Sequence, residues 1–373
     1  SCLNRPRLAV CHRGRYRDCR VEIVMISRKI IASWHIAVLT ALLGSLLSGC
    51  ALPSLAGPRD GPRNGDLRIH AQAIDLNPEE PGHTRVGKLE FRAGLCLSST
   101  APAFGGLSGL SLSPDGKGLT AVSDQGDVLL ARLLWDGAGR LQGLADAVMH
   151  RLRGLDGQPL SWRPDKREQD AEAVESLADG SYLVSFEGNH RVLRYAGLLS
   201  RPALFAIPPG IAKAPRNGGL EAMTPLADGR VLVLSEKFRS EKNGGKGKGY
   251  YIGWLLTADG QSLGQVYWPG TENFRPTDLA ALPNGDVLLL QRRFTLVGGA
   301  GARISRIPAV RIKAGGLLID EELAQLTLPM AVDNFEGLAV RRDPKSGWLI
   351  YLLSDNNFNP LQRTLLLQFY LAE

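Results

Sequence analysis

The chain of 373 residues has almost no net charge once its first 49 residues are set aside. Those residues hold 8 of the 44 lysines and arginines but only 2 of the 37 acidic residues, so 36 basic and 35 acidic residues remain. The overall charge of +7 is therefore a property of the N-terminus. Without a basic excess elsewhere, the sequence gives no indication of a nucleic-acid partner.

A hydrophobic run long enough to cross a membrane is also missing, since a spanning helix needs about 20 apolar residues. The run IAVLTALLGSLL is shorter; it follows Met25, Arg28 and Lys29 and ends in LSGC at Cys50. This order is typical of a signal peptide. It resembles a bacterial lipoprotein signal with residues 47–50 as the lipobox, and an uncleaved membrane anchor is the alternative.

The N-terminal pattern predicts four segments. Residues 1–24 are upstream translation rather than native protein, residues 25–49 the signal peptide, residues 50–65 a lipidated Cys50 with a flexible tether, and residues 66–373 the folded domain. The lipid would anchor the protein in the bacterial cell envelope, at the outer membrane and facing the periplasm, because Ala51 rather than an Asp follows Cys50. Lipidation leaves Cys96 as the single other cysteine of the mature chain, which excludes a disulfide framework and a cysteine zinc site.

The folded domain repeats a strand, a tight turn and a strand five times. Four turns contain dipeptides that tolerate positive φ angles, and the fifth copy has DPKSG instead. The dipeptides are Asp115-Gly116, Asp179-Gly180, Asp228-Gly229 and Asn284-Gly285. Another strand pair, such as residues 250–268, usually separates the hairpins. The pattern predicts an all-β fold, a β-propeller of five or six four-stranded blades, closed by a strand between residues 65 and 96 such as KLEFRAG.

Acidic residues recur at the start of the first strand and at the end of the second strand of each hairpin. These positions lie at the same end of an antiparallel pair, so in a propeller they would meet at one mouth of the central channel. Calcium, which takes six to eight oxygen ligands, suits such a ring; capping of each loop by its own acid is the alternative. The first-strand positions are Ser108, Glu172, Glu221, Asp278 and Glu336, and the second-strand positions are Asp124, Glu187, Glu236, Gln291 and Asp355, of which the eight acids are candidate metal ligands.

Basic residues follow the second strands and should emerge at the same mouth. They are His190, Arg191, Lys237, Arg239, Arg292, Arg293 and Arg363, with Arg275 nearby. The Gly-rich segment 241–250 lacks the spacing of a phosphate-binding P-loop; it could close over an anion or be a solvated loop. No G-x-S-x-G elbow is present, and His190 is the one histidine after Cys50 at a repeat loop, so a Ser-His triad finds little support.

Four stretches together resemble the phytase-like propeller family, described as "esterase-like activity of phytase", over residues 85–373. They are DAEAV, FEGNHRV, RPTDLAALPNGDVLLLQRRF and SDNNFNPLQRTLLLQFYL. By analogy with calcium-dependent phytases, the resemblance implies hydrolysis of phosphate monoesters in a small phosphorylated or anionic substrate. Five acids match the family pattern, whereas Gln291 replaces an acid; the matching acids are Glu172, Glu187, Glu236, Glu336 and Asp355.

The mechanism implied by this resemblance is metal-assisted hydrolysis. Calcium held by the acids would neutralise the phosphate and lower the pKa of a water. Arg292, Arg293 and Lys237 would stabilise the developing negative charge, with His190 as the fourth catalytic candidate. The alternative function is a non-catalytic propeller that binds a partner or a small ligand at the same mouth and uses calcium structurally, because propeller folds host both.

Overall fold

The computed structural model describes residues 65–160, 166–240, 249–295 and 298–373, all within a compact unit from Cys50 to Glu373. The predicted signal peptide, Cys50 and nearly all of the tether lie outside the described residues. Cys96 is disulfide-bonded, contrary to the expectation of a chain without disulfides, and every other cysteine lies outside the described residues. No helix within the described ranges is long and apolar enough to cross a membrane.

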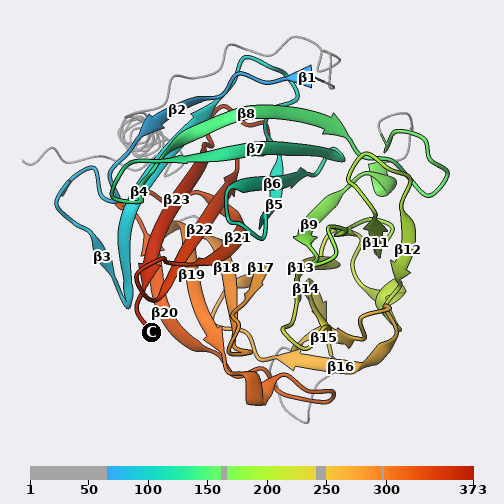
Figure 1. Ribbon diagram of the computed structural model, residues 1–373. Helices are drawn as coiled ribbons and strands as arrows, with labels where there is room; N and C mark the ends of the chain where they lie inside the picture. The colour runs from blue at the N-terminus through green and yellow to red at the C-terminus, as the bar shows by residue number, and fades with distance from the viewer. Residues whose placement is uncertain (1–64, 161–165, 241–248, 296–297) are drawn as a thin grey trace, which may run out of the picture. The chain divides into compact units, whose positions relative to one another are not determined.

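Five antiparallel sheets stand around a central channel, one for each repeat (Figure 1). Blade 1 contains β5 (Leu107–Leu112), β6 (Gly118–Ser123), β7 (Asp127–Trp135) and β8 (Leu141–Arg151), with β1 (Gly65–Asp66) at its edge. Blade 2 contains β9 (Ala171–Ser176), β10 (Tyr182–Phe186), β11 (Arg191–Tyr195) and β12 (Ala203–Ala206). Blade 3 contains β13 (Leu220–Pro225), β14 (Val231–Arg239), β15 (Tyr251–Leu256) and β16 (Ser262–Trp268).

The other two blades follow the same order from the channel outward. Blade 4 contains β17 (Arg275–Ala281), β18 (Val287–Thr295), β19 (Gly299–Ile307) and β20 (Glu321–Thr327). Blade 5 contains β21 (Asn334–Arg342), β22 (Trp348–Asp355), β23 (Thr364–Leu371) and β4 (Leu89–Ser98), to which β2 (His70–Ala73) and β3 (Arg85–Val86) are added. In the described part of the chain, three short 3-10 helices lie in the connections: Lys166–Glu168, Ile211–Lys213 and Ala309–Arg311.

The ring is closed by the N-terminal strand β4, which pairs antiparallel with β23 from Leu97 opposite Thr364 to Leu89 opposite Leu371. The last repeat supplies only three strands of its own, so blade 5 needs a fourth from elsewhere in the chain. The prediction that a strand such as KLEFRAG completes the ring is confirmed, and the number of blades is five. The innermost strands contact one another in the cyclic order β5, β9, β13, β17 and β21.

Each blade packs between two neighbours, so its inner strands are apolar on both faces, whereas outer strands such as β12 and β16 are partly exposed. Residues 287–290 of β18, with the sequence VLLL, are fully buried, and so are Ile350, Tyr351 and Leu352 of β22. Continuous apolar runs of this kind are typical of strands covered on both sides. The stacked sheets therefore form a rigid wall around the channel, and side chains at the strand ends are held in fixed positions.

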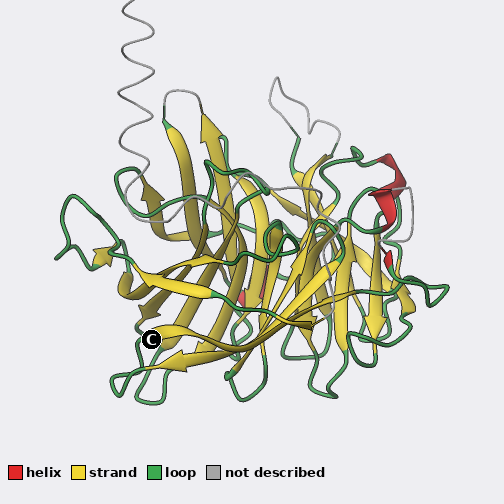
Figure 2. Cartoon of the chain, turned by 90° about the horizontal axis from the view of Figure 1, so that it is seen from above, coloured by secondary structure: helices red, strands yellow, loops and turns green. Residues whose placement is uncertain are grey.

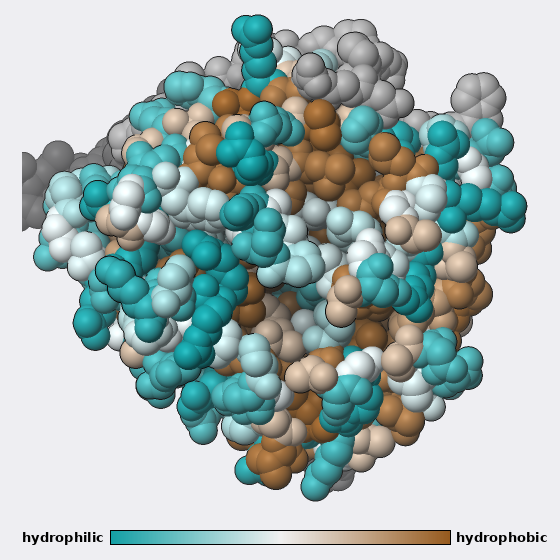
Figure 3. Space-filling model, in the orientation of Figure 1, coloured by the Kyte–Doolittle hydropathy of each residue, from teal (hydrophilic) through white to brown (hydrophobic). Residues whose placement is uncertain are grey.

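The predicted hairpin turns are present at one face of the ring. Gly116, Gly180, Gly229 and Gly285 have φ angles between +70° and +89°, which glycine adopts without strain. Figure 2 shows the strands from the side, and the labelled C-terminus lies toward the face of the ring on which these turns are found. Figure 3 shows this face, on which apolar side chains gather over blade 1, at the top of the view. The candidate site lies at the opposite face.

Candidate functional site

Each innermost strand contains a β-bulge close to its first residues. In blade 2, Ala171 pairs with Phe186 and Ala173 with Ser185, so Glu172 has no partner in the ladder. A bulge bends the strand and re-aims the extra side chain. The residues left out of the five ladders, here called the bulge positions, are Ser108, Glu172, Glu221, Thr277 and Glu336.

A second set of side chains lies at the end of the second strand of each hairpin or directly after it, opposite the residue two places before the bulge. Arg292 pairs with Arg275 in this way, and Asp355 with Asn334. We call these residues the hairpin-end positions. They are Asp124, Glu187, Glu236, Arg292 and Asp355.

Blade 4 breaks the acidic pattern, because Thr277 occupies its bulge position and Arg292 its hairpin-end position. Asp278 and Gln291, the residues expected there from the sequence, each lie one residue away along the strand. The spacing of the repeats contains the signal that identifies the correct residue. Every bulge residue lies seven places before the Asp or Asn that begins its turn, and seven places before Asn284 is Thr277.

Asp278 and Gln291 consequently bind groups away from the mouth. The carboxylate of Asp278 accepts hydrogen bonds from the backbone N–H groups of Leu279 at 2.8 Å and Leu338 at 2.7 Å. The amide of Gln291 donates to Ser305 Oγ at 2.8 Å and accepts from Arg303 at 3.0 Å, inside blade 4. Burial and then the Glu175 carboxylate raise the pKa of Asp278. Asp278 therefore links innermost strands and lies near Glu175 rather than among the acids of the mouth.

The acids of the other four blades converge at one end of the channel. Carboxylate oxygens of Asp170, Glu172 and Glu187 all lie within 4.8 Å of one another. Glu172 is also repelled by Glu336 of blade 5 and Asp124 of blade 1. Glu221 of blade 3 is repelled by Glu172, Glu187, Glu236 and Glu336. The convergence expected from the hairpin geometry is present, and Asp170, two residues before its bulge, joins it without having been predicted.

Burial and mutual repulsion make these carboxyl groups unusually weak acids. Burial, followed by the Glu187 carboxylate, raises the pKa of Asp170 to about 6. Burial and then neighbouring carboxylates raise the pKa values of Glu172 and Glu221 well above their usual range. Three carboxyl pairs lie within hydrogen-bonding range: Asp170 with Glu172, Glu187 with Glu221, and Glu336 with Asp355. Two carboxyls can share a hydrogen bond only when one holds a proton, so the cluster needs either protons or a cation.

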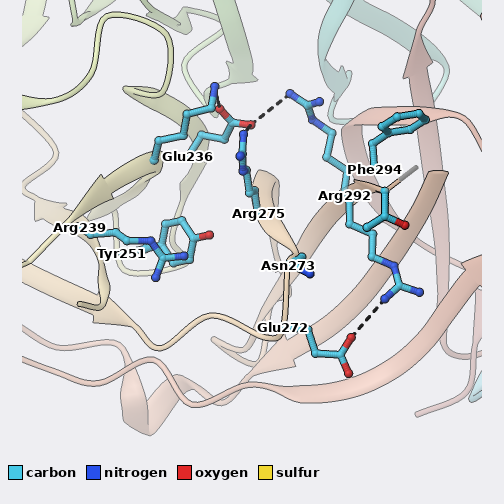
Figure 4. A pocket seen from close by; sticks show the side chains of 11 residues that line it. Glu236, Arg239, Tyr251, Glu272, Asn273, Arg275, Arg292 and Phe294 are labelled. Carbon is cyan, nitrogen blue, oxygen red and sulfur yellow. Dashed lines mark hydrogen bonds and ion pairs between the residues drawn. The ribbon is translucent and has the colours of Figure 1, made fainter. Parts of the chain in front are cut away.

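Three basic side chains surround the buried carboxylate of Glu236. Arg292 Nη2 lies 3.2 Å from Glu236 Oε1 and 3.0 Å from Glu336 Oε1. Arg275 Nη1 lies 3.5 Å from Glu236 Oε1, and Lys237 Nζ pairs with the other oxygen. Figure 4 shows Arg275 pointing toward Glu236 at the edge of a pocket. Glu236 thus joins the acidic cluster to a basic surface.

This pocket, of about 670 Å³, is lined by residues of blades 3 and 4. Arg239 stacks on the Tyr251 ring at 3.6 Å, and Arg293 pairs with Glu272 at 3.2 Å. Phe294, 75% exposed, also lines it. The basic lining residues exceed the two acidic ones, Glu236 and Glu272, and the excess favours an anion. The basic lining residues are Lys237, Arg239, Arg275, Arg292 and Arg293.

The remaining predicted basic residues have other surroundings. His190 is buried against Gly219, and burial lowers its pKa, so it is neutral near pH 7. Arg191 pairs with Glu168 at 3.1 Å, and Arg363 with Asp333 at 3.4 Å. None of the three lines the basic pocket. Residues 241–248 of the Gly-rich segment lie outside the described residues.

Local capping, the alternative role for the acids, also occurs. Asp355 accepts a hydrogen bond from the N–H of Asn357 at 2.7 Å. Glu187 accepts one from Gly219, at the entry to blade 3, at 2.6 Å. The first bond lies within one loop, whereas the second joins two blades. Capping therefore accounts for part of the role of Asp355 but does not explain why acids from four blades meet.

The chain matches a protein-family model and is distantly similar to solved structures. Among solved structures, a gluconolactonase from Xanthomonas campestris is 10% identical with a TM-score of 0.38, covering 86% of this chain and 98% of that one. The β-propeller domain of Cps50 from Myceliophteria thermophila is 9% identical with a TM-score of 0.37, covering 82% and 100%. No curated protein matches the chain. The family model "Phytase-like: Esterase-like activity of phytase" matches residues 102–358, more than half of the chain, and the protein belongs to this phytase-like family.

Proposed function

We propose that the protein is a calcium-dependent phosphoric ester hydrolase acting at the acidic mouth of the channel. The observation that carries this proposal is the shared position of Glu236, which borders the acidic cluster on one side and the basic pocket on the other. A phosphate ester needs positive charge around its oxygens, and a divalent cation needs carboxylates; this mouth offers both within a few side chains.

The acidic cluster has the chemistry and dimensions for calcium. Calcium binds carboxylate oxygens at about 2.4 Å, so two ligands of one ion can lie up to about 5 Å apart. The oxygens of Asp170, Glu172 and Glu187 lie within 4.8 Å of one another. Glu172 is the bulge residue of β9 and Glu187 directly follows β10, so both lie at the same end of one hairpin. These three residues would hold the ion, with Glu221 beside them.

The chain's own residues would bind and orient the ester. Bound calcium would supply charge neutralisation and a more acidic water. The side chains of Lys237 and Arg275 are 34% and 49% exposed, respectively. They would bind phosphate oxygens at the Glu236 edge of the pocket. Arg239 and Arg293, held by Tyr251 and Glu272, would bind the outer end of the substrate. Donors held in place by such partners stabilise developing negative charge without reorganising.

A panel of phosphate monoesters, assayed with calcium and with a chelator, tests this function. The proposal expects phosphate release that depends on calcium and is restored when calcium is added back. The alternative is a non-catalytic propeller with a structural ion, and the ion pairs that already occupy Arg292 and Arg293 favour it. Retained calcium binding with no turnover of any ester would support that alternative.

We also propose that the protein is a lipoprotein anchored in the cell envelope through Cys50. The support is the sequence LSGC after a basic and an apolar stretch, together with a folded domain that begins within about twenty residues of Cys50. Labelling with a fatty acid tests the anchor. A Cys50→Ala protein that still sediments with membranes would contradict it.

A further inference from the structure

Arg292 is the exception in a ring of acids. The hairpin-end positions of the other four blades are Asp124, Glu187, Glu236 and Asp355, all of them carboxylates. Blade 4 places a guanidinium at the same point of the same ladder, with Arg292 opposite Arg275. A side chain at this position is directed by the hairpin toward the shared mouth. The Arg292 side chain therefore lies in the acidic cluster, as a cation that belongs to the protein itself.

The contacts of Arg292 are those expected of a counter-ion. Nη2 bridges Glu236 of blade 3 and Glu336 of blade 5 at 3.2 and 3.0 Å. Nη1 donates to Asn334 Oδ1 at 2.8 Å. Although burial opposes its charge, the carboxylates of Glu336 and Glu236 raise the pKa of Arg292 further. The guanidinium thus spans two blades that flank its own, as an ion placed between them would.

Arg292 forms ion pairs on one side of the cluster only, although the carboxylates of Glu221 and Glu172 also raise its pKa. Within the described parts of the chain, no Lys or Arg forms an ion pair with Glu172 or Glu221, whose strands belong to blades 2 and 3. Repulsion among these carboxyls is relieved by a proton or by an added cation. On the side of Glu236 and Glu336 the cluster has an ion-paired cation, Arg292. On the side of Asp170 and Glu187 the charges of Arg216 and Lys237 lower the pKa values of these two acids, but within the described residues neither base forms an ion pair with them.

We propose that Arg292 is a resident cation that occupies the place of a divalent ion between Glu236 and Glu336, and so confines metal binding to the side of Asp170, Glu172 and Glu187. Arg292 then limits the number of metal ions in the ring and acts as a positioning residue. It holds two carboxylates that would otherwise bind a further ion. The identity of that ion as calcium rests on the proposed function.

Calcium titration calorimetry and thermal unfolding of three variants test this inference. Arg292→Gln removes the charge and should bind one calcium ion more than the parent, with a lower melting temperature in chelator and a larger rise on adding calcium. Arg292→Lys keeps the charge and should bind the same number as the parent. Arg293→Gln, a neighbour paired with Glu272 outside the cluster, is the control and should also bind the parent number.

The outcomes separate this inference from the proposed function. The inference would be overturned if Arg292→Gln bound the same number of calcium ions as the parent and showed the same calcium-dependent rise in melting temperature. It would also be overturned if Arg292→Gln failed to fold even when calcium was present during refolding. If the parent binds no calcium but Arg292→Gln binds one ion, the role of Arg292 as a resident cation stands, whereas the metal site at Asp170, Glu172 and Glu187 and calcium-dependent hydrolysis by the parent both fail. If both bind calcium in the expected ratio and no ester is hydrolysed, the inference stands beside a non-catalytic propeller.

Discussion

The carboxylate of Asp278 in blade 4 accepts a 2.7 Å hydrogen bond from the backbone N–H of Leu338 in blade 5. Innermost strands of neighbouring blades share no ladder, so this contact ties two sheets together at the channel. Asp278→Asn should lower the free energy of unfolding by about 1–3 kcal/mol, because an amide N–H₂ group would then face backbone donors. Urea unfolding measures the loss. Calcium should still raise the melting temperature of Asp278→Asn. If it did not, Asp278 would have to be counted among the metal ligands.

The ion-free protein should lose stability as the pH rises. Burial and the Glu187 carboxylate raise the pKa of Asp170 from 3.8 to about 6, so the folded state binds this proton more tightly than the unfolded state. The stabilisation is fully present below pH 3.8 and lost as the pH passes through 6, an effect of about 3 kcal/mol for this group. Melting curves in chelator at pH 5 and pH 8 measure it. Calcium should remove most of the difference, and a higher melting temperature at pH 8 in chelator would contradict the account.

Glu172 and Glu175 lie three residues apart on β9 and provide a matched pair. Glu172 belongs to the three-carboxylate cluster, whereas Glu175 hydrogen-bonds with Thr224 and Ser111 farther along the channel. Calcium at a hundred times its dissociation constant should stabilise the parent by about 2.7 kcal/mol. Glu172→Gln should remove most of this gain and Glu175→Gln very little. Equal losses in both variants would argue against a localised ion.

The basic pocket predicts a loss of catalysis rather than of folding. Lys237→Ala and Arg275→Ala should each lower kcat/KM for a phosphate monoester by about 10- to 100-fold, since each removes a positive charge beside the phosphate. Arg194→Ala is the control, because Arg194 pairs with Asp179 at the opposite face. If the parent hydrolyses the ester in a calcium-dependent way and the two pocket variants have the same kcat/KM as the parent, the ester binds outside this pocket.

The fold could be predicted from the sequence because turn and strand signals recur locally. Dipeptides such as Asp228-Gly229 fix the hairpins, and the incomplete fifth repeat requires a strand from the N-terminal region, which β4 supplies. The arrangement of the acids followed from antiparallel pairing alone. The register of blade 4 did not follow from the sequence pattern, because Asp278 matches the acids of the other copies in chemistry but not in distance from the turn, and Gln291 was aligned together with it.

Other parts of the site depend on contacts between distant segments. The pairing of Arg292 with Glu336 joins residues of neighbouring blades, and no local pattern indicates it. Asp170 belongs to the cluster because the bulge at Glu172 turns the strand, a feature that depends on backbone geometry. The stacking of Arg239 on Tyr251, which fixes one wall of the basic pocket, likewise follows from the pairing of β14 with β15.

A crystal structure determined with calcium, using anomalous differences to locate the ion, tests the central claim most directly. The account predicts an ion bound by carboxylate oxygens of Asp170, Glu172 and Glu187, with Arg292 still bridging Glu236 and Glu336. A mouth in which Asp170 and Glu172 stay hydrogen-bonded to each other at saturating calcium, with no anomalous peak among the three carboxyl groups, would contradict it.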